Sequence, residues 1–307
     1  MKPKVLLIGG TGFVGMHMRN LHMSKYEVIT IGRDIDIRNH YKIDDLIRTL
    51  NPHVVINFAA LTTVRETIDN PLENYEVGFL GTLGLLTSLR KYKFLGIFLN
   101  ISSSEVYGYP LTSELPLTED SPLRPMSPYA VNKVSVEALC YQWAQGSEFR
   151  IVTARSFTHI GPGQSDRFAI SNIAKQIAEI NIGKREPVVH VGNMHTTRDI
   201  TDVRDVVVAY DLLINLGKNG EIYNVCSSNQ VKVDLIFSKL ISFGNTSIQI
   251  IQDPNLKRPQ EQEHILGSYE KLHRTTQWVP KIVLDKTLFD TFKQWEDFYT
   301  NSGNLRT

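Results

Sequence analysis

Strand-like apolar runs alternate with amphipathic helical segments through the first half of the chain, and a glycine-rich turn, Gly9 to Gly15, follows the first run directly. Together these observations predict an α/β fold, a Rossmann-type doubly wound parallel sheet. The last third of the chain mixes short helices and strands, which predicts a smaller mixed α/β C-terminal substrate-binding lobe. We expect residues 1–157, with about 198–227, to form the dinucleotide-binding domain, and about 158–197 with 228–307 to form the lobe.

Composition bounds the possible functions. The 307 residues are 42% hydrophobic and carry a net charge of +1, which indicates neither a nucleic acid nor an anionic membrane as partner. The apolar run Val5–Ile8 is too short for a signal sequence or a membrane span. Cys140 and Cys226 are isolated, as expected of reduced thiols in a cytoplasmic protein. The nine histidines form no HExxH-like cluster, so no metal is expected.

The glycine turn lies between a strand, Lys4–Ile8, and a helix, Phe13–Met23. A strand, a glycine turn and a helix in that order form a phosphate-binding site at the helix N-terminus. Gly9 permits the tight turn, Gly12 lets the backbone approach a pyrophosphate, and Gly15 lets the helix pack closely on the strand. We expect the whole turn to contact a dinucleotide: Gly9, Thr11, Gly12, Phe13, Val14 and Gly15.

The end of the second strand, Glu27–Ile31, bears on cofactor choice. Arg33 suits the 2′-phosphate of NADP(H), whereas Asp34 suits the free ribose hydroxyl of NAD(H). Both residues are present, and the arginine comes first, so we favour NADP(H) over NAD(H). Asp36 and Ile37 follow and are expected beside the adenine.

A helix over His40–Leu50 and a strand over Val54–Phe58 come next. Small residues at the end of that strand leave room for the cofactor and the substrate: Ala59, Ala60, Thr62 and Thr63. A long helix follows from Asn70 to about Lys91. Its interior contains Gly78, Gly81 and Gly84, each of which costs roughly 1 kcal/mol relative to alanine. We therefore expect this helix to approach the sheet or another helix closely.

The fourth strand, Gly96–Ile101, leads into a polar segment that contains Ser103. Polar groups at the carboxyl end of a central strand belong to the ligand crevice of such a sheet. A further helix begins at Ser127, a suitable N-cap, and carries Tyr129 and Lys133 one turn apart on one face. A neighbouring ammonium lowers the pKa of a phenol, so the pair is expected to transfer a proton near neutral pH.

The second half of the chain continues with further expected elements. These are a strand at Arg150–Ser156, a loop at His159–Gln164, helices at Ala169–Asn181 and from Arg198 to Leu216 with Asp202 as N-cap, strands at Val188–Val191, Glu221–Val225 and Ser247–Ile251, and helices from Asp234 and over Asp285–Tyr299.

Several motifs resemble the extended short-chain dehydrogenase/reductase family, the NAD-dependent epimerases and dehydratases. They are GGTGFVG (9–15), NFAA (57–60), SSSEVYG (102–108) and SPYAVNK (127–133). Within that family RSFTHIGPGQ (155–164), VGNMHTTRDITDVRDVV (191–207) and KRPQEQE (257–263) are most similar to GDP-4-dehydro-6-deoxy-D-mannose reductases. The resemblance implies reduction by NAD(P)H of the C4 keto group of a nucleotide-linked 4-keto-6-deoxy sugar, GDP-linked by preference, with a hexose or a heptose.

The resemblance also implies roles for single residues. Tyr129 would donate the proton, Ser103 would hydrogen-bond to it, Lys133 would hold the nicotinamide ribose, and Glu105 would complete the catalytic group. The substrate residues would be Thr63, Ser104, Thr158, Gln164, Lys175, Arg198 at the diphosphate, and Arg258 with Glu261 around the GDP ribose. The sequence departs from the family at Thr158 and at Gly78, where the family has asparagine.

Rival interpretations remain open. Glu105 lies where nucleotide-sugar 4,6-dehydratases have a glutamate, although many of them have an aspartic acid at Ser104. A 4-epimerase is a further possibility, as is a non-catalytic dinucleotide-binding subunit, which would be expected to lack Tyr129 or Lys133. The resemblance also implies a homodimer that pairs through the helices Asn70–Lys91 and Ser127–Gly146.

Overall fold

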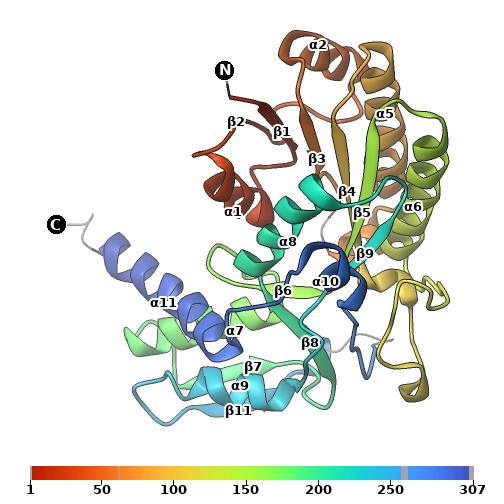
Figure 1. Ribbon diagram of the computed structural model, residues 1–307. Helices are drawn as coiled ribbons and strands as arrows, with labels where there is room; N and C mark the ends of the chain where they lie inside the picture. The colour runs from red at the N-terminus through yellow and green to blue at the C-terminus, as the bar shows by residue number, and fades with distance from the viewer. Residues whose placement is uncertain (1, 62, 257–261, 304–307) are drawn as a thin grey trace.

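The central feature of the molecule is a six-stranded parallel sheet (Figure 1). The computed structural model describes residues 2–61, 63–256 and 262–303. The strand order is β2-β1-β3-β4-β5-β9. The strands are β1 (Lys4–Ile8), β2 (Glu27–Ile31), β3 (Val54–Asn57), β4 (Ile97–Ser103), β5 (Arg150–Ser156) and β9 (Ile222–Val225). The chain leaves β1 first to one side and then to the other, so a ligand crevice is expected at the carboxyl ends of β1 and β3. The predicted fold class is confirmed.

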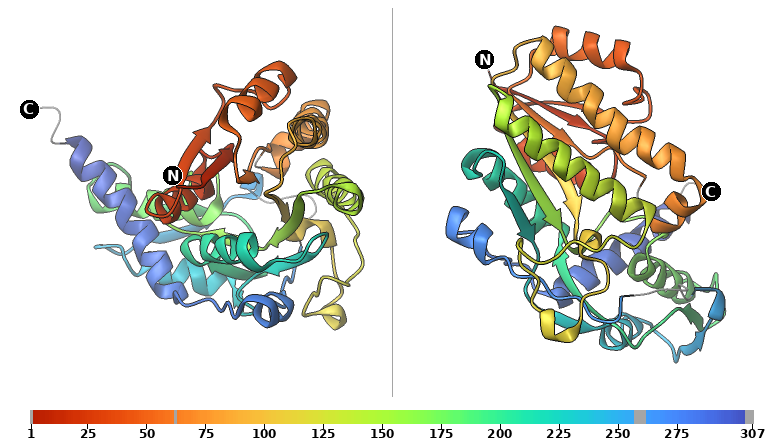
Figure 2. Two further views of the ribbon diagram at one scale, coloured as in Figure 1. Left: turned by 45° about the horizontal axis from the view of Figure 1, so that its top comes forward. Right: turned by 90° about the vertical axis from the view of Figure 1, so that its right-hand side faces the viewer.

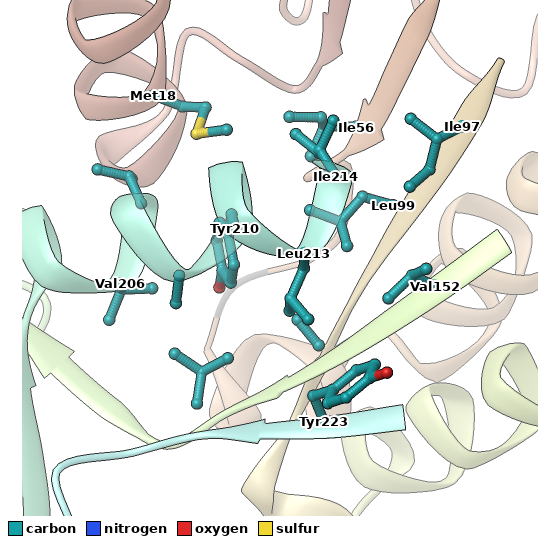
Figure 3. Close-up of a cluster of buried hydrophobic side chains, with 14 of the residues drawn as sticks. Met18, Ile56, Ile97, Leu99, Val152, Val206, Tyr210, Leu213, Ile214 and Tyr223 are labelled. Carbon is teal, nitrogen blue, oxygen red and sulfur yellow. The ribbon is translucent and has the colours of Figure 1, made fainter. Parts of the chain in front are cut away.

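Helices cover both faces of this sheet because the strand side chains alternate between them. Leu6 and Ile8 of β1 join a core with α2 (His40–Leu50), α5 (Gly81–Lys91) and α6 (Pro128–Gly146). Val5 and Leu7 face α1 (Phe13–His22), α8 (Val203–Leu216) and α10 (Glu270–Thr276). Figure 3 shows this second core, where Met18 of α1 and Leu213 of α8 point toward strand residues such as Leu99.

A smaller group of elements lies below the carboxyl edge of the sheet in Figure 1. It contains the three-stranded sheet β10-β8-β6 and the two-stranded sheet β11-β7. Its elements are β6 (Thr158–Ile160), α7 (Ala169–Asn181), β7 (Val188–Val191), β8 (Thr197–Asp202), β10 (Gln230–Lys232), α9 (Val233–Ile241), β11 (Gln249–Gln252) and α11 (Leu284–Gly303). Among the residues that the structure describes, no helix is both long and apolar enough to cross a membrane.

The segment around β8 differs from the sequence-based prediction. We expected a helix from Arg198, but Thr197–Asp202 is a strand that pairs with β6 and β10, and α8 begins only at Val203. Asp202 is the N-cap of α8, as predicted, and accepts a hydrogen bond from Arg204 N. The strand depends on pairing with Thr158–Ile160, within a segment predicted as a loop, which local sequence does not reveal. Residues 198–202 therefore belong to the smaller sheet, whereas our division placed them in the dinucleotide domain.

The predicted helix of residues 70–91 is present in three parts. These are α4 (Pro71–Tyr75), a π-helical turn (Glu76–Leu80) and α5. The close approach inferred from its glycines is also present. A β-carbon on Gly81 would lie 2.7 Å from Ile37 Cγ2, and one on Gly84 would lie 2.2 Å from His40 Nδ1.

Candidate active site

Tyr129 and Lys133 lie in the first two turns of α6. This helix begins as the sequence predicts, because Ser127 Oγ accepts a hydrogen bond from Ala130 N at 3.1 Å and Pro128 occupies the first position. Both side chains are half-buried. Lys133 Nζ donates to the carbonyl oxygen of Ile101 in β4 at 2.7 Å and lies 5.6 Å from the centre of the Tyr129 ring. The lysine thereby ties the helix to the carboxyl end of β4.

Ser103 joins this pair because β4 extends two residues beyond its predicted end. Its hydroxyl accepts a hydrogen bond from Glu105 N at 3.2 Å and is also hydrogen-bonded to the side chain of Tyr129. Glu105 is half-buried, and its negative charge acts on the same phenol. The structure thus brings together all four residues that were predicted to be catalytic.

The pKa values of the pair differ from the prediction. Burial raises the pKa of Tyr129 to about 12, against a smaller lowering by the hydrogen bond to Ser103. Burial also lowers the pKa of Lys133 to about 8, which the charge of Glu137 partly offsets. The predicted lowering of the Tyr129 pKa is therefore not found, because burial of the phenol dominates and the Lys133 ammonium donates to the Ile101 carbonyl. At neutral pH the phenol holds its proton and the lysine is charged.

The glycine turn has the close approaches that its sequence predicts. Gly9 has a φ of +71°, and a β-carbon there would lie 2.9 Å from Ala59 N at the end of β3. A β-carbon on Gly15 would lie 2.4 Å from the Gly10 Cα. Gly12 and Thr11 are exposed, and the first turn of α1, all of it described, contains no acidic residue. An exposed helix N-terminus without acidic side chains fits a dinucleotide pyrophosphate. Phe13 and Val14 are half-buried behind it.

Two of the residues that follow β2 are held within their own turn. Asp34 Oδ1 accepts a hydrogen bond from Gly32 N at 2.8 Å, and Asp36 Oδ2 pairs with Arg38 at 2.7 Å, which lowers the Asp36 pKa. Arg33 is exposed. Ile37 is buried and packs on Gly81, so its side chain belongs to the core; only its backbone can face an adenine.

The predicted ligand-binding residues after β3 differ in their burial and in the hydrogen bonds that they already make. Ala59 and Ala60 are half-buried beside the glycine turn, and Ala59 N donates to Asn57 Oδ1 at 3.1 Å. Thr63 caps α3 (Val64–Asp69), since its hydroxyl accepts from Glu66 N at 3.2 Å. Thr62 lies outside the described residues.

The other predicted substrate residues lie on both the central sheet and the smaller group of elements. Thr158 is half-buried in β6, and Ser104 is buried after β4. Gln164 is buried and donates to the His159 carbonyl at 3.0 Å; its Oε1 has no partner among the described residues. Lys175 pairs with Asp166 at 2.7 Å. Arg258 and Glu261 lie outside the described residues.

Arg198 lies on β8, half-buried, with its guanidinium donating to the Thr197 carbonyl at 2.8 Å. The two acidic residues near it in the sequence, Asp199 and Asp202, have other hydrogen-bond and ion-pair partners. Asp199 accepts hydrogen bonds from Ser227 N, Ser228 N and Gly267 N, and Asp202 pairs with Arg204.

Comparison with known proteins agrees with this geometry. The family model described as GDP-mannose 4,6 dehydratase matches residues 33–291. The chain belongs to this family. It is 36% identical to the GDP-6-deoxy-D-mannose reductase of Pseudomonas aeruginosa, over 96% of this chain and 98% of that protein.

Solved structures lead to the same family. A structure described as RMD from Pseudomonas aeruginosa complexed with NADPH is 35% identical and has a TM-score of 0.90. The match covers 97% of this chain and 100% of that one. A UDP-glucose 4-epimerase from Thermotoga maritima has a TM-score of 0.88 at 22% identity, covering 96% of this chain and 99% of that one, which shows the shared fold. The resemblance to epimerases, dehydratases and reductases of this family is thus confirmed.

A buried polar network that was not predicted from the sequence lies next to the candidate active site. Arg155 of β5 pairs with Glu137 of α6 at 2.7 Å, each only 4% exposed, and Arg155 also donates to the Tyr107 hydroxyl at 3.0 Å. Tyr107 in turn donates to Asn224 Oδ1 at 2.7 Å. The one sequence feature that pointed to this network is the position of Glu137, one helical turn after Lys133 on the same face of the helix.

Proposed function

We propose that this chain is an NAD(P)H-dependent nucleotide-sugar 4-ketoreductase. Its substrate would be a nucleotide-linked 4-keto-6-deoxy sugar, with GDP-4-dehydro-6-deoxy-D-mannose favoured and a heptose analogue as the variant. The observation that carries the proposal is the meeting of Ser103, Tyr129 and Lys133 at the carboxyl edge of the sheet. The match to a reductase over nearly the full length of both proteins supports it.

The chain's own residues account for the proton. The reduced nicotinamide, when bound, supplies the hydride to C4. As the carbonyl oxygen gains negative charge, Tyr129 gives it the phenolic proton, and the hydrogen bond with Ser103 orients the hydroxyl. Lys133, anchored on the Ile101 carbonyl, places a positive charge beside the phenolate that results. A phenol that holds its proton at neutral pH suits a group that acts as an acid.

NADP(H) is the proposed cofactor. Arg33 is exposed at the end of β2, whereas Asp34 and Asp36, which would suit a free ribose hydroxyl, are held by Gly32 N and Arg38. The structural neighbour with a TM-score of 0.90 is described as a complex with NADPH. A 2′-phosphate therefore has an available cation there.

The smaller group of elements, at residues 158–202, 230–252 and 284–303, would bind the nucleotide sugar. Arg198 is the proposed diphosphate ligand, and Gln164, with its free buried oxygen, a ligand of the base or sugar. Lys175 would have to leave Asp166 to reach a phosphate. We also propose a cytoplasmic homodimer, as the family resemblance implies; the two buried free cysteines fit a reducing compartment.

A nucleotide-sugar 4,6-dehydratase is the second candidate, favoured by the description of the matching family model and by Glu105 beside Tyr129. That reaction oxidises C4 only transiently and regenerates its cofactor. The two functions therefore differ in cofactor stoichiometry.

The deciding experiment measures NADPH consumption with freshly made GDP-, dTDP- and CDP-4-keto-6-deoxy sugars and, in parallel, with GDP-mannose, followed by NMR of the product. One NADPH consumed per sugar, with a 4-hydroxy product, would establish a ketoreductase. Turnover of GDP-mannose without net NADPH loss would establish the dehydratase. Cofactor binding without turnover of any of these sugars would favour a non-catalytic binding protein.

A further inference from the structure

Asn132 lies on α6 between Tyr129 and Lys133 and is almost fully buried, at 2% exposure. Its Nδ2 donates to the Asn74 backbone oxygen at 2.7 Å and to Asn74 Oδ1 at 3.2 Å. Asn74 Nδ2 donates in return to the Pro128 carbonyl at 2.9 Å. A single residue of α4 therefore holds the first turn of α6 at both its start and its end, and Tyr129 lies between these two points.

Gly78 provides the space for this carboxamide. A β-carbon on Gly78 would lie 1.9 Å from Asn132 Nδ2, 2.6 Å from Cγ and 2.7 Å from Oδ1. No side chain at position 78 can coexist with the present position of Asn132. The π-helical turn of residues 76–80 and α6 run side by side at this contact (Figure 2). A side chain at position 78 and one at position 132 would thus occupy the same space, and in this chain the Asn132 side chain of α6 fills it.

The backbone of Gly78 continues toward the proposed cofactor edge. Thr82 Oγ1 donates to the Gly78 carbonyl at 2.6 Å, and Asn57 Nδ2 donates to Thr82 Oγ1 at 3.0 Å. Asn57 Oδ1 then accepts from Ala59 N at 3.1 Å, beside the glycine turn. A continuous series of contacts therefore joins the first turn of α6 to the end of β3.

We propose that Asn132 is a positioning residue for the reduction, seated on Gly78 because the two positions share one space. By fixing the first turn of α6 to Asn74 and Gly78, it sets the Tyr129 hydroxyl and the Lys133 ammonium relative to the edge where the nicotinamide would bind. This inference rests on the proposed role of Tyr129. Its physical basis is the steep dependence of proton transfer and hydride transfer on geometry.

The test uses Asn132→Ser, Gly78→Asn and the double variant, with Gln142→Ser as the control on an exposed face of α6. A displacement of about 1 Å can reduce a rate about 100-fold, so we expect kcat of Asn132→Ser to fall by about 10- to 100-fold. The KM for NADPH should change less than kcat, because the residues of the glycine turn itself are not replaced. Gly78→Asn should be impaired by the clash. The double variant should regain most of the lost kcat, because the carboxamide then comes from position 78.

Two results would overturn the inference: wild-type kcat in Asn132→Ser, or a folded double variant no more active than Gly78→Asn alone. If Gly78→Asn fails to fold, recovery of folding in the double variant shows the shared space, and its kcat still decides the positioning role. Tyr129→Phe separates this inference from the proposed function. An active Tyr129→Phe enzyme refutes the role of the phenol itself, whereas an inactive one with a fully active Asn132→Ser refutes only the positioning.

Discussion

At the scale of the residue, Tyr129 is the group on which the proposed chemistry depends. Replacing Tyr129 by Phe removes the proton donor and leaves the ring, so kcat with a 4-keto sugar nucleotide should fall about 10²- to 10⁴-fold. The affinity for NADPH, measured by fluorescence titration, should stay close to that of the wild type. Substantial turnover by the variant would assign the proton to another group.

The lowered pKa of Lys133 predicts how activity depends on pH. Its pKa of about 8 lies below its ordinary value because burial penalises the ammonium, so the charge is lost as pH rises through that value. Tyr129, with a pKa near 12, keeps its proton over the same range. We expect kcat/KM to fall above about pH 8. Lys271→Met, which removes a half-buried lysine paired with Glu221, should leave this profile unchanged. A profile flat to pH 10 would contradict the assignment.

Arg33 should govern the choice between the two nicotinamide cofactors. Arg33→Ala removes the proposed partner of the 2′-phosphate, a charge-assisted hydrogen bond worth about 1.5–3 kcal/mol. The KM for NADPH should rise accordingly while that for NADH, which lacks this phosphate, stays the same. Equal effects on both cofactors would show that Arg33 does not contact the 2′-phosphate.

At the scale of the element, the glycine turn and α1 are coupled by backbone contact. Gly15→Ala would place a methyl group 2.4 Å from the Gly10 Cα, and backbone cannot move aside as a side chain can. Overpacking of this kind costs about 1–3 kcal/mol, and we expect both lower thermal stability and weaker NADPH binding.

Gly146→Ala is the matched control, because nothing lies within 4 Å of the β-carbon that it would add at the end of α6. It should change neither property for the worse. Normal NADPH binding by Gly15→Ala would mean that the turn adjusts without cost.

The elements that were predicted well are those that local sequence specifies. The start of α6 is specified by the N-cap Ser127 and the proline that follows it. The strands β1 and β2 begin and end where their apolar runs do. The strand β8 was missed because its pairing partners lie at residues 158–160 and 230–232, distant in sequence. Likewise the contact between Gly78 of the π-helical turn and Asn132 joins residues more than fifty positions apart, which local sequence does not reveal. The direction of the Tyr129 pKa shift could not be predicted either, since it follows mainly from burial of the phenol in the folded chain.

At the scale of the whole molecule, the buried pair of Arg155 and Glu137 joins β5 to α6 beneath the site. Arg155→Met would leave the Glu137 carboxylate buried without its partner, which costs about 3–5 kcal/mol. The midpoint of urea unfolding should fall by the corresponding amount, and the double variant Arg155→Met/Glu137→Leu should recover most of it.

The exposed pair of Arg274 and Glu270 offers the contrast, because surface ion pairs contribute little. Arg274→Met should leave the unfolding midpoint almost unchanged. If Arg155→Met also left the unfolding midpoint unchanged, the buried ion pair would not contribute to the stability of the sheet and its helices.

The protonated, half-buried phenol of Tyr129 has a consequence for the solution around the enzyme. A group that gives up its hydrogen ion once per catalytic cycle must be recharged from the medium before the next cycle. In a weakly buffered sample the proposed reaction should therefore alkalinise the medium, taking up one hydrogen ion for each NADPH oxidised. A glass electrode beside the spectrophotometer would record the two quantities together.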